Sequence, residues 1–570
     1  MKKNNNFKLF LRFYRRFPIP WWMFLISAVL GVISTQITFA IADYTIRINK
    51  GELYNWVILG YVLLTVLNSL IAILQNQFSN YGSYKITLRA RGVLWNKILH
   101  LKVKDVDEKG PSGLVSGVTI DVGQASLVIS MVFLFVSSIY GFGKACVILY
   151  QYNSRMSLYL LVLIPAALFM FWFVGKTQLS CNRKIYASYN KMTGYFSEHL
   201  SAVKHVKAQA TEEHEITDGY RTIDAKYKAD LLYAVLSTLQ TVVNSIYSNL
   251  STVITCVFGA GLIKRGQMES TGINNTTTYL GNVNKYMSEV LTQYQTTRGT
   301  QGALSQVNDI LNLQAEDPDK GDSFVLSENK DIVFEHVSFG YTDKEVLHDL
   351  SFTLPYKKTI AIVGNNGSGK TTLLKLMQGL YMADSGTITV GGNEIGKVKL
   401  RELRKRFSYI LQNDNLFSGT IRENICYGCE RTVSDEEMKK AAVMAGADEF
   451  IMRFPEGYDT MLTEAGMNLS GGQRKRLSFA RAFLQETDYF LLDEAGANLD
   501  NKSCGIIYRS LKEKMKEKTV IFIAHEMDEI MSADYILVLD HGCLEAFGTH
   551  EQLLRTSRVY ADYVACIQNA

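Results

Sequence analysis

The fold is decided by the stretch Gly364-Asn365-Asn366-Gly367-Ser368-Gly369-Lys370-Thr371-Thr372. An apolar run at residues 359–363 precedes it and a helical pattern at residues 373–377 follows it, so G-x-x-x-x-G-K-[ST] stands in a strand–loop–helix context. Glycines let backbone N–H groups turn toward a phosphate, and the following helix adds the positive end of its dipole. We expect Lys370 to reach the β- and γ-phosphates and the Thr371 hydroxyl to bind Mg²⁺. The sequence therefore predicts a nucleoside triphosphate site built from Gly364, Asn366, Gly367, Ser368, Gly369, Lys370, Thr371 and Thr372.

The 570 residues divide by composition into two parts. Repeated apolar runs fill residues 1–315, a polar stretch at 316–330 is typical of a linker, and residues 331–570 read as a soluble domain. The predicted fold class is an all-α transmembrane domain of six helices followed by an α/β P-loop NTPase domain. The net charge is +5, and the basic residues do not form one tract. The sequence therefore gives no reason to expect a nucleic-acid partner.

Five stretches are long and apolar enough to cross a bilayer, which takes about 20 residues. A sixth, at 276–303, is more polar and carries Lys285, Glu289 and Arg298, so a long loop is its alternative. The five stronger candidates are residues 22–46, 54–74, 127–150, 158–174 and 242–263.

The basic residues gather between the second and third spans and between the fourth and fifth spans. The positive-inside rule then places the N-terminus and both long loops in the cytoplasm, and the loops read as helices extended from the membrane. A nucleotide-binding C-terminus must lie on the same side of the cytoplasmic membrane, which requires an even number of spans. The polar segment is therefore predicted to be a sixth span lining a pathway. Its candidate lining residues are Tyr279, Lys285, Tyr286, Glu289, Gln293, Tyr294, Gln295 and Arg298.

Two further motifs follow the phosphate loop. An apolar strand at 489–492 ends in Asp493 and Glu494, and we expect it beside the P-loop strand, with Asp493 on Mg²⁺ and Glu494 polarising the attacking water. A second phosphate-friendly turn precedes it, a hydroxyl and flexible amides at the start of a helix, formed by Ser470, Gly471, Gly472 and Gln473.

The order of these motifs resembles the ATP-binding cassette family, and six spans ahead of one cassette resemble its exporter-type half-transporters. The resemblance implies that Tyr341 stacks on adenine, that Gln412 contacts Mg²⁺ and the membrane domain, and that His525 contacts the γ-phosphate. It also matches Asp500 to the loop crossing the dimer interface, and Glu464 to an acidic segment that touches the partner's loops. The positions matching the family's catalytic residues are Lys370, Asp493, Glu494 and His525.

The sequence departs from the family pattern at three places. Ala497 and Asn498 stand where the family usually has Ser and Ala, and Asp105-Val106 replaces the usual aromatic pair of the first cytoplasmic turn. The sixth span is also more polar than most. None of these departures falls on a catalytic position.

In the family, ATP is clamped between the P-loop of one chain and the signature turn of another, so the resemblance implies a dimer. Both half-sites are intact, which favours a homodimer, while a heterodimer with an unlike partner stays open. The favoured function is an ATP-hydrolysing exporter that moves an amphipathic or polar solute, a peptide or drug-like molecule, by alternating access. The alternatives are a lipid flippase, an importer of the same architecture, and an ATP-gated channel or regulatory subunit. The last class tends to lose the catalytic acid, yet Glu494 is present.

Overall fold

The computed structural model describes residues 19–568, apart from 153, 156–164, 166–180, 182–183, 186, 190, 270, 343, 412–415, 494–504, 508 and 512–516. The chain forms two compact units. One comprises Met1–Leu99 and Gly110–Leu313, and the other comprises His100–Lys109 and Gln314–Ala570. The short segment His100–Lys109 therefore belongs with the C-terminal part, although the chain enters and leaves it from the helical part.

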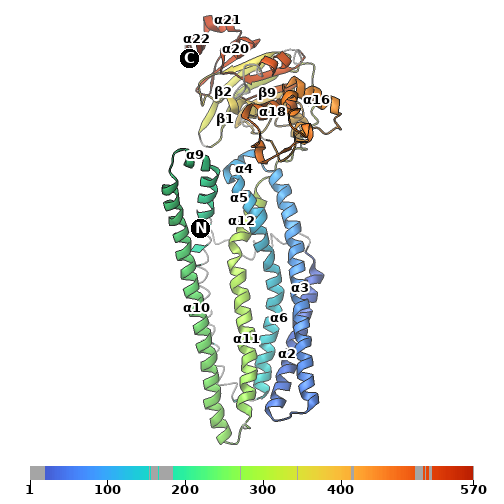
Figure 1. Ribbon diagram of the computed structural model, residues 1–570, viewed down its shortest axis with the longest axis vertical. Helices are drawn as coiled ribbons and strands as arrows, with labels where there is room; N and C mark the ends of the chain where they lie inside the picture. Colours follow the sequence, from blue (N-terminus) through green and yellow to red (C-terminus); the bar gives the residue numbers. More distant parts are fainter. Residues whose placement is uncertain are drawn as a thin grey trace. The chain divides into compact units, whose positions relative to one another are not determined.

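The first unit is helical, and its helices α2, α3, α6 and α11 lie side by side, with α10 alongside α11 (Figure 1). Its elements are α2 (Trp21–Asn49), α3 (Asn55–Leu99), α5 (Pro111–Ser116), the π-turn η1 (Gly117–Asp121), α6 (Val122–Tyr152), α9 (Val203–Ala208), α10 (Glu212–Lys264), α11 (Gly272–Gly299) and α12 (Gln301–Asn312).

Four helices in the described part of this unit are long and apolar enough to span a membrane: Trp21–Asn49, Asn55–Leu99, Gly113–Tyr152 and Glu212–Lys264. They match the predicted first, second, third and fifth spans, whereas the predicted fourth span, 158–174, lies almost wholly outside the described residues. At about 1.5 Å per residue, α3 and α10, of 45 and 53 residues, are much longer than a hydrocarbon core of about 30 Å. Part of each must therefore extend beyond the membrane.

The predicted sixth span is a helix, α11, and not a loop. It is less apolar than the four helices named above, yet it packs along α6 (Figure 1). Tyr279, Leu280 and Val283 on one face are buried against α2 and α6. Gly141 of α6 lets the ring of Tyr286 approach, because a Cβ there would lie 2.6 Å from that ring. A single apolar face therefore holds a polar helix in the bundle.

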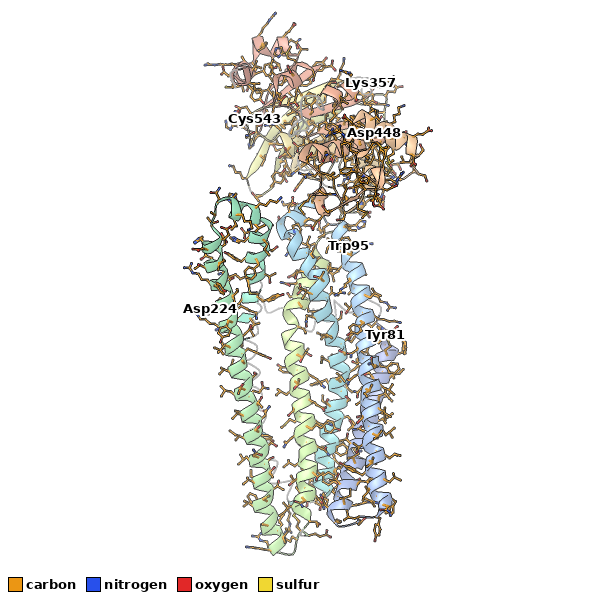
Figure 2. All side chains as sticks on the ribbon, in the orientation of Figure 1. Tyr81, Trp95, Asp224, Lys357, Asp448 and Cys543 are labelled. Carbon is orange, nitrogen blue, oxygen red and sulfur yellow. The ribbon has the colours of Figure 1, made fainter. Side chains whose placement is uncertain are left out.

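Both α3 and α10 carry many exposed side chains, including Tyr81 in the middle of α3 and Trp95 near its end (Figure 2). Arg91 of α3 reaches the π-turn, where its guanidinium donates to the carbonyl oxygens of Val118 at 3.1 Å and Thr119 at 2.7 Å. A π-turn shifts the helical hydrogen-bond pattern, and Arg91 supplies donors to the carbonyls at that break.

The second unit is an α/β domain whose main sheet has the strand order β12-β11-β3-β10-β9-β6. These strands are β3 (Thr359–Val363), β6 (Phe407–Ile410), β9 (Tyr489–Leu492), β10 (Thr519–Ile523), β11 (Tyr535–Asp540) and β12 (Cys543–Gly548). All pairs are parallel except the one between β11 and β12. Every residue of β9 and β10 is buried, as expected for strands covered on both faces. The prediction that β9 lies beside β3 was wrong, because β10 pairs between them.

Smaller sheets and helices complete this unit. A second sheet has the order β2-β1-β4-β5, made of β1 (Ile332–Gly340), β2 (Glu345–Leu354), β4 (Ser385–Val390) and β5 (Asn393–Glu394), and a third pairs β7 (Gly419–Thr420) with β8 (Met461–Leu462). The helices and 3₁₀ turns are α4 (Val103–Lys109), α13 (Lys370–Met377), α14 (Leu400–Arg404), α15 (Ile421–Ile425), α16 (Asp435–Met444), α17 (Asp448–Ile451), η2 (Gly457–Asp459), η3 (Glu464–Gly466), α18 (Gly471–Leu484), α20 (Met527–Met531), α21 (His550–Thr556) and α22 (Arg558–Gln568).

Residues 316–330, predicted to be a linker, pack against this second unit. Arg404 donates to both carboxylate oxygens of Glu316, at 2.7 and 2.9 Å, and Phe324 is buried. The segment around α4 is attached at the same place, where the Glu316 amide donates to the His100 carbonyl at 2.6 Å. The Tyr381 hydroxyl also donates to the Asp107 carboxylate of α4. The segment His100–Lys109 is thus held to the rest of the second unit by backbone and side-chain hydrogen bonds.

Candidate functional site

The predicted nucleotide residues follow the carboxyl ends of parallel strands. The phosphate loop follows β3, Asp493 follows β9, and His525 comes two residues after β10. Because these strands are parallel and in register, their carboxyl ends meet at one edge of the sheet. The intervening strand β10 therefore does not separate the P-loop from Asp493.

Glycine is required at two points of the phosphate loop. Gly364 has a φ of +147°, and a Cβ there would lie 2.1 Å from the Leu539 carbonyl oxygen. Gly369, with a φ of +98°, is the N-cap of α13, and a Cβ there would lie 2.4 Å from the Leu347 side chain. The loop can take this path only without side chains at these two positions.

Lys370 begins α13, and its ammonium group closes the loop. The side chain is buried, and Nζ donates to the carbonyl oxygens of Gly364 at 2.7 Å and Asn365 at 3.0 Å. Nearby, the Ser368 hydroxyl oxygen is buried and has no hydrogen-bond partner among the described residues. A buried hydroxyl without a partner is costly, so a ligand oxygen at this loop would satisfy it. The loop therefore fits a bound phosphate.

Thr371 and Asp493 meet at the mouth of the loop. The Thr371 hydroxyl donates to Oδ1 of Asp493 at 3.1 Å, and Asp493 is buried. A hydroxyl and a carboxylate are the hard oxygen ligands that Mg²⁺ uses together with water and phosphate oxygens. Within the described residues, no group of three or more His, Cys, Asp or Glu side chains could hold a metal ion by itself. These two residues thus fit an ion that shares its coordination with a nucleotide.

Tyr409 is a further residue at this carboxylate, and sequence reasoning missed it. Its hydroxyl donates to Oδ2 of Asp493 at 3.3 Å from the neighbouring strand β6. Burial, followed by the nearby Asp493 charge, raises the pKa of Tyr409, so the phenol remains a donor at neutral pH. No pattern in the sequence marks Tyr409, and only the structure shows that it is the partly exposed position of an otherwise buried strand.

Tyr341 lies just beyond β1, where its hydroxyl is 3.1 Å from the Thr372 hydroxyl. Its ring makes edge contacts with Phe339 and Tyr381, at centroid distances of 5.1 Å each. The Lys375 ammonium group lies 5.6 Å from the Tyr341 ring centroid. An aromatic ring is thus fixed next to the phosphate loop, in keeping with the predicted adenine contact.

The signature turn is the N-terminus of α18. The Ser470 hydroxyl accepts from the Gln473 amide at 3.2 Å, and the Gln473 side chain accepts from the Ser470 amide at 2.8 Å, which forms a capping box. Ser470 is exposed. The predicted residues Ser470, Gly471, Gly472 and Gln473 therefore form one ordered turn that remains accessible.

Lys475 is a second residue that the sequence did not single out. It is buried in α18, and its ammonium group donates to the Leu411 carbonyl at 3.2 Å. Leu411 immediately precedes Gln412, so Lys475 joins the signature helix to the start of the Gln412 loop. A lysine within a basic run normally suggests an exposed side chain, and only the packing of α18 against β6 shows the contrary.

The remaining predicted residues differ in how much the structure says about them. His525 is exposed, and its amide donates to Oε2 of the buried Glu529 at 3.1 Å. Gln412, Glu494 and Asp500 lie outside the described residues, as do Ala497 and Asn498. The acidic Glu464 is exposed in η3.

Two of the predicted pathway residues in α11, Tyr279 and Tyr286, instead pack inside the helical unit. Tyr279 donates to Asp43 of α2 at 2.8 Å, and both tyrosines are buried. The Glu289 carboxylate accepts from the Ser138 hydroxyl at 3.0 Å, and Gln293 donates to the same hydroxyl at 3.1 Å. Lys285 and Tyr294 are exposed, and nothing is described of the side chains of Gln295 and Arg298. Sequence alone could not tell which face of α11 meets its neighbours.

Comparison with known proteins agrees with both units. The family model of the ABC transporter transmembrane region matches residues 21–286, and the ABC transporter model matches residues 347–497. A multidrug resistance ABC transporter ATP-binding and permease protein of Lactococcus lactis subsp. cremoris is 29% identical, over 98% of this chain and 96% of that protein. An ATP-dependent lipid A-core flippase of Legionella pneumophila (strain Paris) is 31% identical, over 98% and 97%. A solved bacterial Atm1-family ABC exporter with ATP bound has the same fold, with a TM-score of 0.83, 23% identity, and coverage of 96% of this chain and 97% of that one.

These features define a multi-pass membrane protein with a helical membrane domain and an ATP-binding domain in one chain. The chain belongs to the ABC transporter family and has the organisation of an exporter half-transporter, which couples ATP hydrolysis to transport.

Proposed function

We propose that the protein is a homodimeric, Mg²⁺-dependent exporter of the cytoplasmic membrane that moves an amphipathic or polar solute by alternating access. The observation that carries the proposal is the Thr371–Asp493 hydrogen bond beside Lys370, since it assembles the predicted ATP- and metal-binding groups in one place. Orientation with both the N-terminus and the ATPase domain in the cytoplasm follows from the loop charges.

Each predicted residue has a role in ATP hydrolysis. Lys370 and the loop amides bind the β- and γ-phosphates, and Tyr341 stacks on the base. Thr371, Gln412 and Asp493 would hold Mg²⁺, which when bound neutralises charge on the β- and γ-phosphate oxygens. Glu494 orients and polarises the attacking water, and His525 contacts the γ-phosphate.

The accessible signature turn supports the dimer. Its amides and helix N-terminus can bind phosphate oxygens, so Ser470–Gln473 of one copy would close over ATP on the P-loop of the other, with Asp500 at the interface. Moving a two-state membrane domain from 1:99 to 99:1 requires about 5.5 kcal/mol of differential binding. Two shared ATP sites can supply this energy. The hydrogen bonds that hold the segment His100–Lys109 to Tyr381 and Glu316 support such coupling, because the chain enters and leaves this segment from the helical unit.

A peptide or drug-like solute is favoured over a plain acyl lipid because the sixth helix exposes polar side chains. A lipid flippase is the second candidate, since the Legionella relative is named for that activity. The remaining alternatives are an importer and an ATP-gated channel of the same architecture.

The test is ATPase activity of the purified protein in lipid nanodiscs, wild type beside Glu494→Gln, with peptides, drugs and lipids added in turn. We expect hydrolysis that is lost in the variant and stimulated by one solute class. Wild-type activity equal to that of the variant would overturn the proposal in favour of a gated channel or of a missing unlike partner.

A further inference from the structure

The helix α18 is attached to the chain on both sides of the Gln412 loop, residues 412–415. Leu411 immediately precedes this loop, and Phe417 comes two residues after it. Each of these two residues is attached to α18 by a basic side chain of that helix. The same helix begins at the signature turn, Ser470–Gln473. One helix thus links the signature turn to both ends of the Gln412 loop.

Lys475 makes the attachment at the start of the loop. Its side chain is only 2% exposed, and its ammonium group donates to the Leu411 carbonyl at 3.2 Å. Removing an ammonium group from water is costly, whereas an apolar side chain of similar length would fill this place without that cost. The buried charge therefore indicates that the bond to Leu411 has a role that packing alone does not require.

Arg481 makes the attachment at the end of the loop, through the buried Asn424 of α15. The guanidinium donates from Nε to the Asn424 backbone carbonyl at 2.9 Å and from Nη2 to Asn424 Oδ1 at 3.3 Å. The Asn424 side chain binds both backbone groups of Phe417, since it accepts from the amide at 2.9 Å and donates to the carbonyl at 2.8 Å. It also donates to the Thr420 carbonyl at 3.1 Å. These bonds use both the oxygen and the NH₂ group of the amide, so they fix its orientation and with it the backbone of Phe417.

The two basic residues stand close together on one short helix. They are six residues apart (481 − 475), which corresponds to about 9 Å along the axis of α18. Because the backbone hydrogen bonds of a helix hold such a distance constant, the two ends of the Gln412 loop keep a fixed position relative to the signature turn.

We propose that Lys475 and Arg481 are positioning residues that tie the Gln412 loop to the signature turn and so hold Gln412 in place for hydrolysis at the P-loop of the same chain. This inference rests on the proposed function, which places Gln412 on Mg²⁺ and the signature turn on the ATP of the second copy. Lys475 acts on the first residue before the loop, and Arg481 acts through Asn424 on the backbone that follows it.

The test is a double-mutant cycle between Lys475→Met and Gln412→Ala. It measures the kcat of Mg²⁺-dependent ATP hydrolysis by the full-length protein in lipid nanodiscs. Methionine keeps the length of the apolar stem and removes the charged donor. We expect each single substitution to lower kcat about tenfold, which corresponds to the loss of one hydrogen bond from a charged group. The double variant should be no more than about twofold slower than either single variant, because both changes remove the same contact of Gln412.

Lys518→Met is the matched control, because it also removes a partly buried lysine from the second unit. The Lys518 ammonium group lies 5.4 Å from the Phe490 ring centroid, and Lys518 precedes β10 at the amino ends of the parallel strands, opposite the nucleotide edge. This variant should keep kcat within about twofold of wild type. If Lys475 served packing alone, its effect would multiply with that of Gln412→Ala, to about a hundredfold in the double variant. Such a product, or a kcat of Lys475→Met within twofold of wild type, would overturn the inference.

Hydrogen exchange provides a second measurement that does not need hydrolysis. Peptides covering residues 411–417 are followed by mass spectrometry in the same nanodiscs. Exchange should be at least about fivefold faster in Lys475→Met and in Arg481→Met, and unchanged in Lys518→Met. Equal exchange in wild type and in both variants would refute the attachment of the loop to α18.

The two measurements also separate this inference from the proposed function. Faster exchange in both variants, together with wild-type hydrolysis no higher than that of Glu494→Gln, refutes the export function alone. Glu494-dependent hydrolysis with effects that multiply in the double variant refutes the positioning role alone.

Discussion

The contact between Tyr409 and Asp493 gives a prediction about the metal requirement of ATP hydrolysis. The Tyr409→Phe substitution removes one hydroxyl from a partly buried position and leaves Thr371 on the other carboxylate oxygen. A hydrogen bond to a charged group contributes about 1.5–3 kcal/mol. At 3.3 Å this bond is longer than the usual ~2.5–3.0 Å for O–H···O, so we take the lower end, about 1.5 kcal/mol, which is roughly tenfold in an equilibrium constant.

We therefore expect Tyr409→Phe to raise the Mg²⁺ concentration for half-maximal ATP hydrolysis about tenfold. Binding of a fluorescent ATP analogue in EDTA should not change. Tyr489→Phe is the matched control, because the Tyr489 hydroxyl donates to the Lys330 carbonyl at 2.7 Å from the neighbouring strand β9. It should lower thermal stability without moving the Mg²⁺ requirement. A shift of less than twofold in Tyr409→Phe, or a lower Mg²⁺ requirement, would show that the phenol does not position this carboxylate.

Three further predictions concern stability and nucleotide binding. Gly364→Ala should abolish ATP photolabelling and cost at least about 2 kcal/mol in thermal unfolding, because its Cβ meets the Leu539 carbonyl at a strained φ; normal labelling would contradict this. Arg404→Met should cost about 2 kcal/mol and speed proteolysis at residues 316–330, since it loses both bonds to Glu316; an unchanged cleavage rate would refute the attachment. Arg431 and the Ser434 amide lower the pKa of Glu437 to about 2 from 4.5, so its stabilising effect is present above pH 4.5 and fades as the pH falls toward 2. The melting temperatures of wild type and Glu437→Gln should thus converge on acidification, and a constant gap would exclude this ion pair as the cause.

Much of the nucleotide site was predictable because its motifs are local. The P-loop, the signature turn and the acid after β9 each combine residues within one strand–loop or loop–helix segment, where backbone geometry follows from a few positions. Strand order was not predictable in the same way, and β10 lies between β3 and β9. Parallel strands can change neighbours without any change in their apolar pattern, since both faces are buried in every arrangement.

Residues that act through a neighbouring segment escaped prediction for a related reason. Tyr409 and Lys475 lie in no motif, and their contacts with Asp493 and Leu411 exist only because β6 packs beside β9 and beneath α18. The contacts of the predicted linker could not be read from the sequence for the same reason, because the partners of Glu316 and Phe324, namely Arg404 and the core of the second unit, lie far along the chain.

The helix α11 shows why low hydropathy did not argue against a membrane location. Stability of a helix within a bundle requires only that one face be apolar and well packed, and Tyr279, Val283 and Tyr286 supply that face against α2 and α6. The opposite face is then free to be polar, provided that it meets water instead of lipid. An exporter needs such a helix, because a solute with a polar group must find hydrogen-bond partners at membrane depth. The polarity of α11 around Lys285 is therefore better explained by a transport pathway than by a loop.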